Sequence, residues 1–571
     1  MSLSYKEFME EVKLRLRNLS SEDICNLILN WASEEHPSKR QDFLDKLTPP
    51  KQKKEVSCNT GTLMDEIEAF AQRVEDGEYC GGWGWDDAIH EERAWGDESW
   101  AEEMDEFFQQ ARRLLMQGED KLAEEVYRRL FDILEMGQEP GHLPGDPDYS
   151  NILKVDLGEQ VALLLRSVYM NATPGERPAL LYESINEYGY LARKIKLKNV
   201  IDALDSQLPD IESFLADWIE FLKNQSDMSI SELLREAIVL KGGVSEISEF
   251  ARQYADKYPK AYLDWIMLLE MGDDTESVIQ VAREGLSRVS QDYTVRAEIA
   301  EIISNIGEQR NDNTLKLEGY RESFYSSPSI GYLLDLYLTA IECGCFNEIR
   351  GIVEQRVAEL RGKGRIPVHN YSSREQSTAY VSEGVLISTL LLGGRFEKVF
   401  EMCKGKGPLG WSSSENPKPI FVTFMLVVLS KGGIHSKMLC KQWEEAIANT
   451  CYNADKLYIQ KYQKLIDTIK ESVKLTCEQE EYYLKWCKDE IGHRVDAIVS
   501  NQHRGSYNKA AGLLVAMAET LANMGEKQEG MDLIEKYKSK YPRHTAFKSE
   551  VTQALQVSGL FGGRVSGKGI R

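Results

Sequence analysis

The chain has 571 residues, more than one hydrophobic core usually accommodates, so its length predicts roughly three or four domains or one long solenoid. Charged residues make up 28% and apolar residues 42% of the chain, as is ordinary for a soluble folded protein. The formal net charge is −23. A surface of this sign repels phosphate backbones, which disfavours direct nucleic-acid binding and favours a protein partner with a basic surface.

Residues 1–50 are predicted to form an N-terminal helical region that ends at Pro49 and Pro50. The first 19 residues contain acids and no apolar segment, so we expect no signal peptide. The ten cysteines are scattered along the chain, which indicates reduced thiols and a cytoplasmic location, not a disulfide framework.

The most unusual stretch begins within residues 51–98, which we predict to be an acidic, Trp-rich linker or loop. Residues 77–106 hold four of the ten tryptophans, and residues 86–106 contain ten acids and one arginine. Their glycines argue against a continuous helix. One interpretation is an acidic, aromatic surface that accepts a basic helix or strand from a partner. The other is a loop whose tryptophans pack against helices while the acids stay solvated. The candidate partner-binding residues are Trp83, Trp85, Trp95, Trp100, Asp86 and Asp87.

Residues 99–230 are predicted to form helical hairpins, most clearly over residues 99–136. This hairpin resembles the tetratricopeptide type, with Leu115, Gly118, Ala123 and Tyr127 near positions that such repeats fill with apolar or small residues. The order of parts also resembles the helical portion of SWIM zinc-finger proteins. The similar parts are LILNWASEEHPSKRQDFLDKL near the N-terminus, the Trp-rich acidic stretch leading into the hairpin, and the closing helices over residues 506–551.

The zinc site of SWIM proteins does not carry over to this chain. Those proteins bind zinc through Cys-x-Cys followed by Cys-x-His, whereas this chain has Cys343-Gly-Cys345 and no Cys-x-His. A structural zinc site needs four ligands, so we expect neither bound zinc nor another cofactor.

Residues 231–402 are predicted to form a tetratricopeptide-like solenoid. A glycine recurs there between amphipathic stretches, at Gly242, Gly272, Gly307, Gly344 and Gly393. Glycine accepts positive φ without steric penalty, so it can end one helix and let the next fold back. Helical pairs must stack on their neighbours to bury their apolar stripes. The predicted fold class is therefore all-α, an irregular tetratricopeptide-like α-solenoid of helical hairpins.

Residues 403–420 are predicted to form an exposed Gly/Ser/Pro loop, followed by a C-terminal helical domain over 421–555 and a flexible basic tail over 556–571. A protease would cut most readily in such a loop or in the adjoining helix end. Such a cut would detach one packed block from another. The apolar run 420–429 is about half the ~20 residues that span a bilayer, so we expect no membrane association. The candidate cleavage positions are Gly405, Gly407, Leu409, Gly410, Ser412 and Met438.

The chain shows no nucleophile elbow, zincin helix, kinase signature or supported Cys/His pair, which favours a non-enzymatic function. The first hypothesis is a scaffold that binds and sequesters a protein. The second is an accessory helical module of a nucleic-acid-processing complex, as in SWIM proteins. The third is an enzyme whose site is formed by distant residues. In size and layout the chain also resembles the protease-substrate protein of type III-E CRISPR systems. That resemblance implies antiviral defence, cleavage by a caspase-like protease, and an extracytoplasmic-function sigma factor held by the uncut protein.

Overall fold

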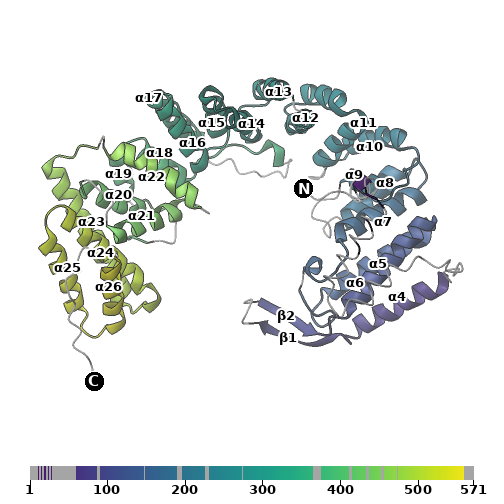
Figure 1. Ribbon diagram of the computed structural model, residues 1–571, viewed down its shortest axis with the longest axis horizontal. Coiled ribbons are helices and arrows are strands. Elements are labelled where there is room, and N and C mark those ends of the chain that lie inside the picture. Colours follow the sequence, from purple (N-terminus) through teal and green to yellow (C-terminus); the bar gives the residue numbers. More distant parts are fainter. Residues whose placement is uncertain are drawn as a thin grey trace. The chain divides into compact units, whose positions relative to one another are not determined.

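The computed structural model describes most of the chain as two compact units, residues 1–247 and residues 248–571 (Figure 1). Within the described residues, the protein has 23 α-helices and a single two-stranded sheet, so the predicted all-α class is confirmed. Contacts run chiefly between helices that follow one another in sequence, which is the packing of an α-solenoid. The described residues are 60–86, 91–146, 148–188, 196–225, 230–272, 274–363, 374–404, 406–410, 415–431, 436–451, 455–471 and 473–558, with seven single positions between 11 and 28.

From residue 60 onward, the first unit consists of a helix, a β-hairpin and then paired helices. Residues 51–98, predicted to be a linker or loop, therefore contain regular structure from residue 60 onward. The predicted helical hairpin over 99–136 is confirmed as α5 and α6, with Gly118 at φ +82 between them. The elements are α4 (Thr60–Glu75), β1 (Cys80–Asp86), β2 (Glu91–Gly96), α5 (Trp100–Gln117), α6 (Asp120–Gly137), the 3-10 helix η2 (Tyr149–Asn151), α7 (Leu157–Asn171), α8 (Arg177–Tyr188), α9 (Leu197–Asp202), α10 (Ile211–Lys223) and the part of α11 (Ile230–Gln253) up to residue 247.

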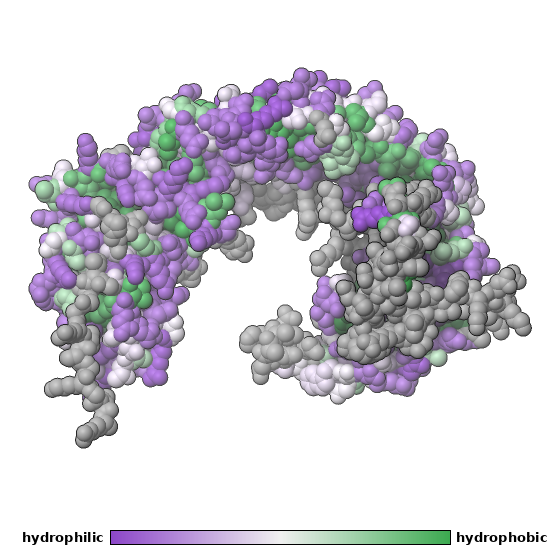
Figure 2. Space-filling model, in the orientation of Figure 1, coloured by the Kyte–Doolittle hydropathy of each residue, from purple (hydrophilic) through white to green (hydrophobic). Residues whose placement is uncertain are grey.

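The second unit contains fifteen further α-helices within the described residues. Hydrophilic residues cover most of the described surface on the face drawn in Figure 2, and hydrophobic side chains form small separate patches. The elements are α12 (Ala261–Glu270), α13 (Thr275–Arg288), α14 (Val295–Arg310), α15 (Asn313–Ser326), α16 (Ile330–Glu342), α17 (Phe346–Lys363), η3 (Arg374–Gln376), α18 (Glu383–Leu392), α19 (Phe396–Lys404), α20 (Lys418–Leu429), α21 (Lys437–Thr450), α22 (Lys456–Lys470), α23 (Cys477–Ser500), η4 (Arg504–Ser506), α24 (Tyr507–Asn523), α25 (Lys527–Lys540) and α26 (Thr545–Ser558).

The recurring glycines do not all have the predicted role. Gly344, at φ +71, lies between α16 and α17, and Gly272 and Gly393 each follow the end of a helix. Gly242 lies at a kink inside α11. Gly307 is inside α14, so the prediction that it separates two helices is wrong.

Gly307 instead allows α14 and α15 to pack very closely. A Cβ atom at Gly307 would lie 2.6 Å from the backbone nitrogen of Lys316 on α15. Reciprocally, a Cβ at Gly319 on α15 would lie 2.5 Å from the backbone nitrogen of Ser304 on α14. Real Cβ atoms essentially never approach backbone this closely, so both positions require glycine at this spacing of the helices.

One hydrophobic core extends from Phe324 to Ala554 and includes residues from α15 to α26. It contains Leu409 of the predicted exposed loop and most of the hydrophobic side chains of α20. The predicted boundary at 403–420 therefore does not separate two packed blocks. The division between compact units lies instead at residues 247 and 248. None of the described helices has the length and apolar composition to cross a bilayer.

Buried carboxylates connect distant parts of the chain through backbone hydrogen bonds. Glu519 on α24 is fully buried and accepts the backbone N–H groups of Met438, at 3.3 Å, and Leu439, at 2.7 Å. These donors lie in the first turn of α21, where backbone N–H groups have no partner within the helix. Asp105, which is also buried, accepts the N–H groups of residues 154 and 155 just before α7. The half-buried Glu236 accepts those of residues 197 and 198 at the start of α9.

Candidate protein-interaction site

The Trp-rich stretch forms an antiparallel β-hairpin at one end of the first unit (Figure 1). Strand β1 alternates glycine and tryptophan from Gly82 to Trp85, and Trp83 pairs with Ala94 on β2. The prediction of a loop at this point is therefore wrong. Asp86 ends β1 opposite Glu91, and Asp87 lies outside the described residues.

Trp95 packs flat across the glycines of the opposite strand. A Cβ atom at Gly82 would lie 2.9 Å from the indole of Trp95, and one at Gly84 would lie 3.0 Å from it. The absence of side chains at these two positions therefore makes room for the ring. Even so, Trp95 remains 47% exposed, because only one side of its indole is covered by the strand.

Trp83 and Trp85 lie on the opposite face of the hairpin, since successive side chains of a strand point to opposite faces. They are 47% and 58% exposed, although tryptophan is usually mostly buried in a folded protein. In Figure 2 this end of the first unit is pale, not the purple of the surrounding charged surface. The hairpin therefore displays large aromatic side chains on both faces.

Trp100 behaves differently from the other three tryptophans and is fully buried. It begins α5, and its Nε1–H donates to the backbone oxygen of Pro144 at 3.1 Å. Its ring contacts Tyr149, with centroids 5.5 Å apart. Trp100 therefore fits the interpretation in which the tryptophans pack against helices. It cannot bind a partner while the protein is folded.

The base of the hairpin is held by a hydrogen-bonded network between α4 and α5. Arg73 on α4 donates to the hydroxyl of Tyr79 at 3.0 Å and is paired with Glu103 on α5. The Tyr79 hydroxyl donates to Glu103 at 2.7 Å. Burial, reinforced by the hydrogen bond to Glu103, raises the pKa of Tyr79 to about 12. This hydroxyl therefore stays protonated, and the network holds the first residues of the hairpin in one position.

Two exposed acids lie beside the hairpin, after the end of β2. Asp97 accepts the backbone N–H of Ser99 at 2.9 Å, and this bond lowers the pKa of its carboxyl. Asp97 is therefore ionised at neutral pH. Glu98 is also exposed and comes next in the chain. Together with the net charge of −23, these carboxylates make the hairpin an acidic and aromatic surface.

The candidate cleavage positions are distributed between surface and core. Gly407 is exposed and Gly410 is half-buried, whereas Leu409 is 1% exposed and packs into the core. Met438 is also buried, in the first turn of α21. Leu409 and Met438 are therefore not accessible to a protease in the folded chain, contrary to the prediction. Gly405 and Ser412 lie outside the described residues.

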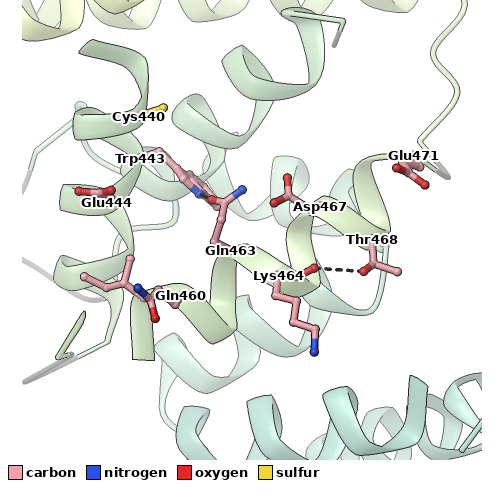
Figure 3. A pocket seen from close by; sticks show the side chains of 10 residues that line it. Cys440, Trp443, Glu444, Gln460, Gln463, Lys464, Asp467, Thr468 and Glu471 are labelled. Atoms are coloured by element: carbon pink, nitrogen blue, oxygen red, sulfur yellow. Dashed lines mark hydrogen bonds between the residues drawn. The ribbon is translucent and has the colours of Figure 1, made fainter. Parts of the chain in front are cut away.

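A cavity of about 580 Å³ opens between α21 and α22, and no motif in the sequence indicates it (Figure 3). Polar residues spaced three or four apart from Gln460 to Glu471 form one wall, a spacing that places them on one face of α22. Trp443 forms part of the opposite wall and donates its indole N–H to Gln463. Burial and the neighbouring carboxylates raise the pKa of the Cys440 thiol to about 11, so this thiol is protonated at neutral pH and is no nucleophile.

Within the described part of the chain, no three His, Cys, Asp or Glu side chains are arranged to hold a metal ion. Cys343 and Cys345 flank the turn at Gly344, where they are exposed and half-buried respectively. Comparison with known proteins gives no family: no protein-family model matches the chain, and no curated protein matches its sequence.

Proposed function

We propose that the protein is a non-enzymatic helical scaffold that binds a protein partner through the hairpin tryptophans Trp83, Trp85 and Trp95. The observation that carries this proposal is the exposure of all three indoles on a hairpin whose base is fixed by hydrogen bonds. Tryptophan is enriched among the residues that dominate binding energy at protein interfaces. An aromatic surface that is already ordered loses little conformational entropy when a partner binds.

The partner has a basic surface on this proposal. The acids beside the hairpin and the charge of −23 attract positive charge at long range, which speeds the encounter and disfavours acidic partners. Lysine and arginine side chains can also stack on exposed indole faces, a contact of about 0.5–1 kcal/mol at exposed sites. We place the protein in the cytoplasm, and the scattered positions of the ten cysteines along the sequence support this location.

We extend this proposal to the function suggested by the type III-E resemblance. The partner would then be a sigma factor, and a caspase-like protease would cut the chain in the segment that contains Gly407. The exposure of Gly407 supports a cut there. Because Leu409 and α20 share the core with the flanking helices, cutting and release of a fragment are separate events.

The scaffold proposal is tested by purifying the tagged chain from its source cells and comparing it with a Trp83→Ala, Trp85→Ala, Trp95→Ala triple variant. A Met271→Ala, Tyr380→Ala variant is the matched control, because these side chains are also large and exposed but lie outside the hairpin. Truncation of an interface hot spot costs about 2 kcal/mol or more, so we expect a basic co-purifying protein to fall at least ~30-fold with the triple variant only. The proposal is wrong if every co-purifying protein is retained by a triple variant whose circular dichroism is unchanged.

A further inference from the structure

The outer edge of β1 has no strand paired to it among the described residues. The carbonyl of Ala94 on β2 accepts the backbone N–H of Gly145 at 3.2 Å, so this carbonyl points away from β1. Two residues that face each other in an antiparallel pair of strands behave alike. Either both direct their N–H and C=O groups toward the other strand, or both direct them to the outside. Trp83 pairs with Ala94, so its N–H and C=O point to the outer edge. Trp85, two residues on, presents its backbone in the same direction.

Around Trp83 and Trp85, this edge lacks most of the usual protection against strand pairing. Natural edge strands are commonly blocked by lysine, by proline or by a bulge within the exposed segment. Strand β1 contains neither lysine nor proline, and its irregularity lies between Cys80 and Gly82, before the two tryptophans. Figure 1 shows β1 on the side of the hairpin away from α6. Among the residues that the structure describes, the main-chain donors and acceptors of Trp83 and Trp85 are therefore open to a third strand.

We infer that an extended basic segment of the partner adds to the hairpin as a third strand along β1, bonding to the main chain of Trp83 and Trp85. This inference rests on the proposed function and specifies how the partner binds. A two-stranded hairpin is only marginally stable in water by itself, and a third strand would complete the sheet. Main-chain hydrogen bonds supply affinity in such complexes, and the side chains that alternate along the added strand supply specificity.

The net charge of the chain determines which kind of segment can bind along the edge of β1. A second copy of the chain would bring a net charge of −23 against an equal charge, with acids beside both hairpins. A segment rich in lysine or arginine instead places opposite charges together and can lay its side chains over the exposed indoles. The edge therefore fits a basic strand from a different protein.

The test uses the full chain and a phage-displayed library of short random peptides. The peptides are selected on the wild-type protein and counter-selected against a Trp83→Ala, Trp85→Ala variant. One enriched peptide is then synthesised with an N-methyl group at each backbone nitrogen in turn, which removes one donor without changing the side chains. We expect enrichment in lysine and arginine, and binding that weakens by about three- to tenfold at every second methylated position. Amide hydrogen exchange at Trp83 and Trp85 should slow when the peptide is bound.

The other outcomes separate the two proposals. Strand addition is wrong if a peptide requires the tryptophans but tolerates methylation at every position. It is also wrong if the sensitive positions do not recur at every second residue. In both cases the scaffold proposal stands. Failure to enrich any peptide that distinguishes the wild type from the double variant overturns both. A dimer of the chain that dissociates with the double variant, in place of peptide binding, would assign the edge to a second copy.

Discussion

Replacing Gly319 by alanine should destabilise the contact between α14 and α15, whereas the same change at Gly351 should stabilise α17. Alanine is favoured over glycine in a helix interior by about 1 kcal/mol. Gly351 is exposed, and a Cβ there would meet no atom within 4 Å, so only this favourable effect operates. We therefore expect Gly351→Ala to raise the free energy of unfolding by about 1 kcal/mol.

At Gly319 the steric cost exceeds the gain in helix propensity. The new Cβ would lie 2.5 Å from the nitrogen of Ser304 and 2.7 Å from the carbonyl oxygen of Ala300. Both are backbone atoms, so no side-chain rotation relieves the contact and the two helices must separate. Overpacking of a core costs about 1–3 kcal/mol, and the crowding here belongs at the upper end. After subtracting about 1 kcal/mol for propensity, we expect a net loss of about 2 kcal/mol for Gly319→Ala.

The assay is amide hydrogen exchange, because a chain with two compact units is not expected to unfold in a single two-state step. Exchange of the slowest amides in α14 and α15 measures the local opening free energy for Gly319→Ala, and exchange in α17 measures it for Gly351→Ala. Thermal unfolding by circular dichroism gives an independent ranking of the two variants. If Gly319→Ala slows exchange as much as Gly351→Ala does, then α14 and α15 are not packed at the spacing described.

Two further predictions concern a buried carboxylate and the candidate cleavage segment. Burial raises the pKa of Glu519 above its ordinary value of 4.5, so its favourable contribution to stability is complete below pH 4.5 and is lost as the pH rises through the folded-state pKa. The local opening free energy of Glu519→Gln relative to wild type should therefore increase from pH 4.5 to 8, by about 1.4 kcal/mol for each unit by which the pKa is raised. It is measured by hydrogen exchange of the slowest amides in α21 and α24, and a pH-independent difference would contradict this. A cut at Gly407 should leave the two fragments associated in gel filtration without denaturant, because the core of residues 324–554 lies on both sides of the cut, and their spontaneous separation would show that the core does not hold them.

The helical part of this fold could be predicted from sequence because its signals are local. Apolar residues recur at helical spacing in α5 and α6, and Gly118 ends the first of these helices in the left-handed conformation. The recurring glycines were harder to interpret, since glycine serves equally well to end a helix and to let two helices approach. Gly344 does the first and Gly307 the second. Only the position of α15 distinguishes the two roles.

The candidate site could be located from sequence, but its structure could not be predicted. Four clustered tryptophans among acids marked the stretch as unusual. Strand β1 lacks the β-branched residues that are typical of strands, and it is organised by Trp95, which packs over Gly82 and Gly84 from the other strand. Likewise, the burial of Leu409 depends on helices distant in sequence. Neither of these contacts can be predicted from the local amino-acid composition.

The hairpin and the candidate cleavage segment belong to different compact units, and this constrains any mechanism in which cleavage releases a partner. The contacts that fix the hairpin come from α4, α5 and the backbone of Gly145, all in the first unit. A cut near Gly407 breaks none of them, and the severed ends remain attached to one continuous core. Cleavage alone therefore removes no contact from a partner bound at Trp83, Trp85 and Trp95. Loosening the core around α20, whose side chains are buried almost without exception, would also leave these contacts of the first unit unchanged. If a single cut near Gly407 releases a partner, that partner must therefore bind to the second unit.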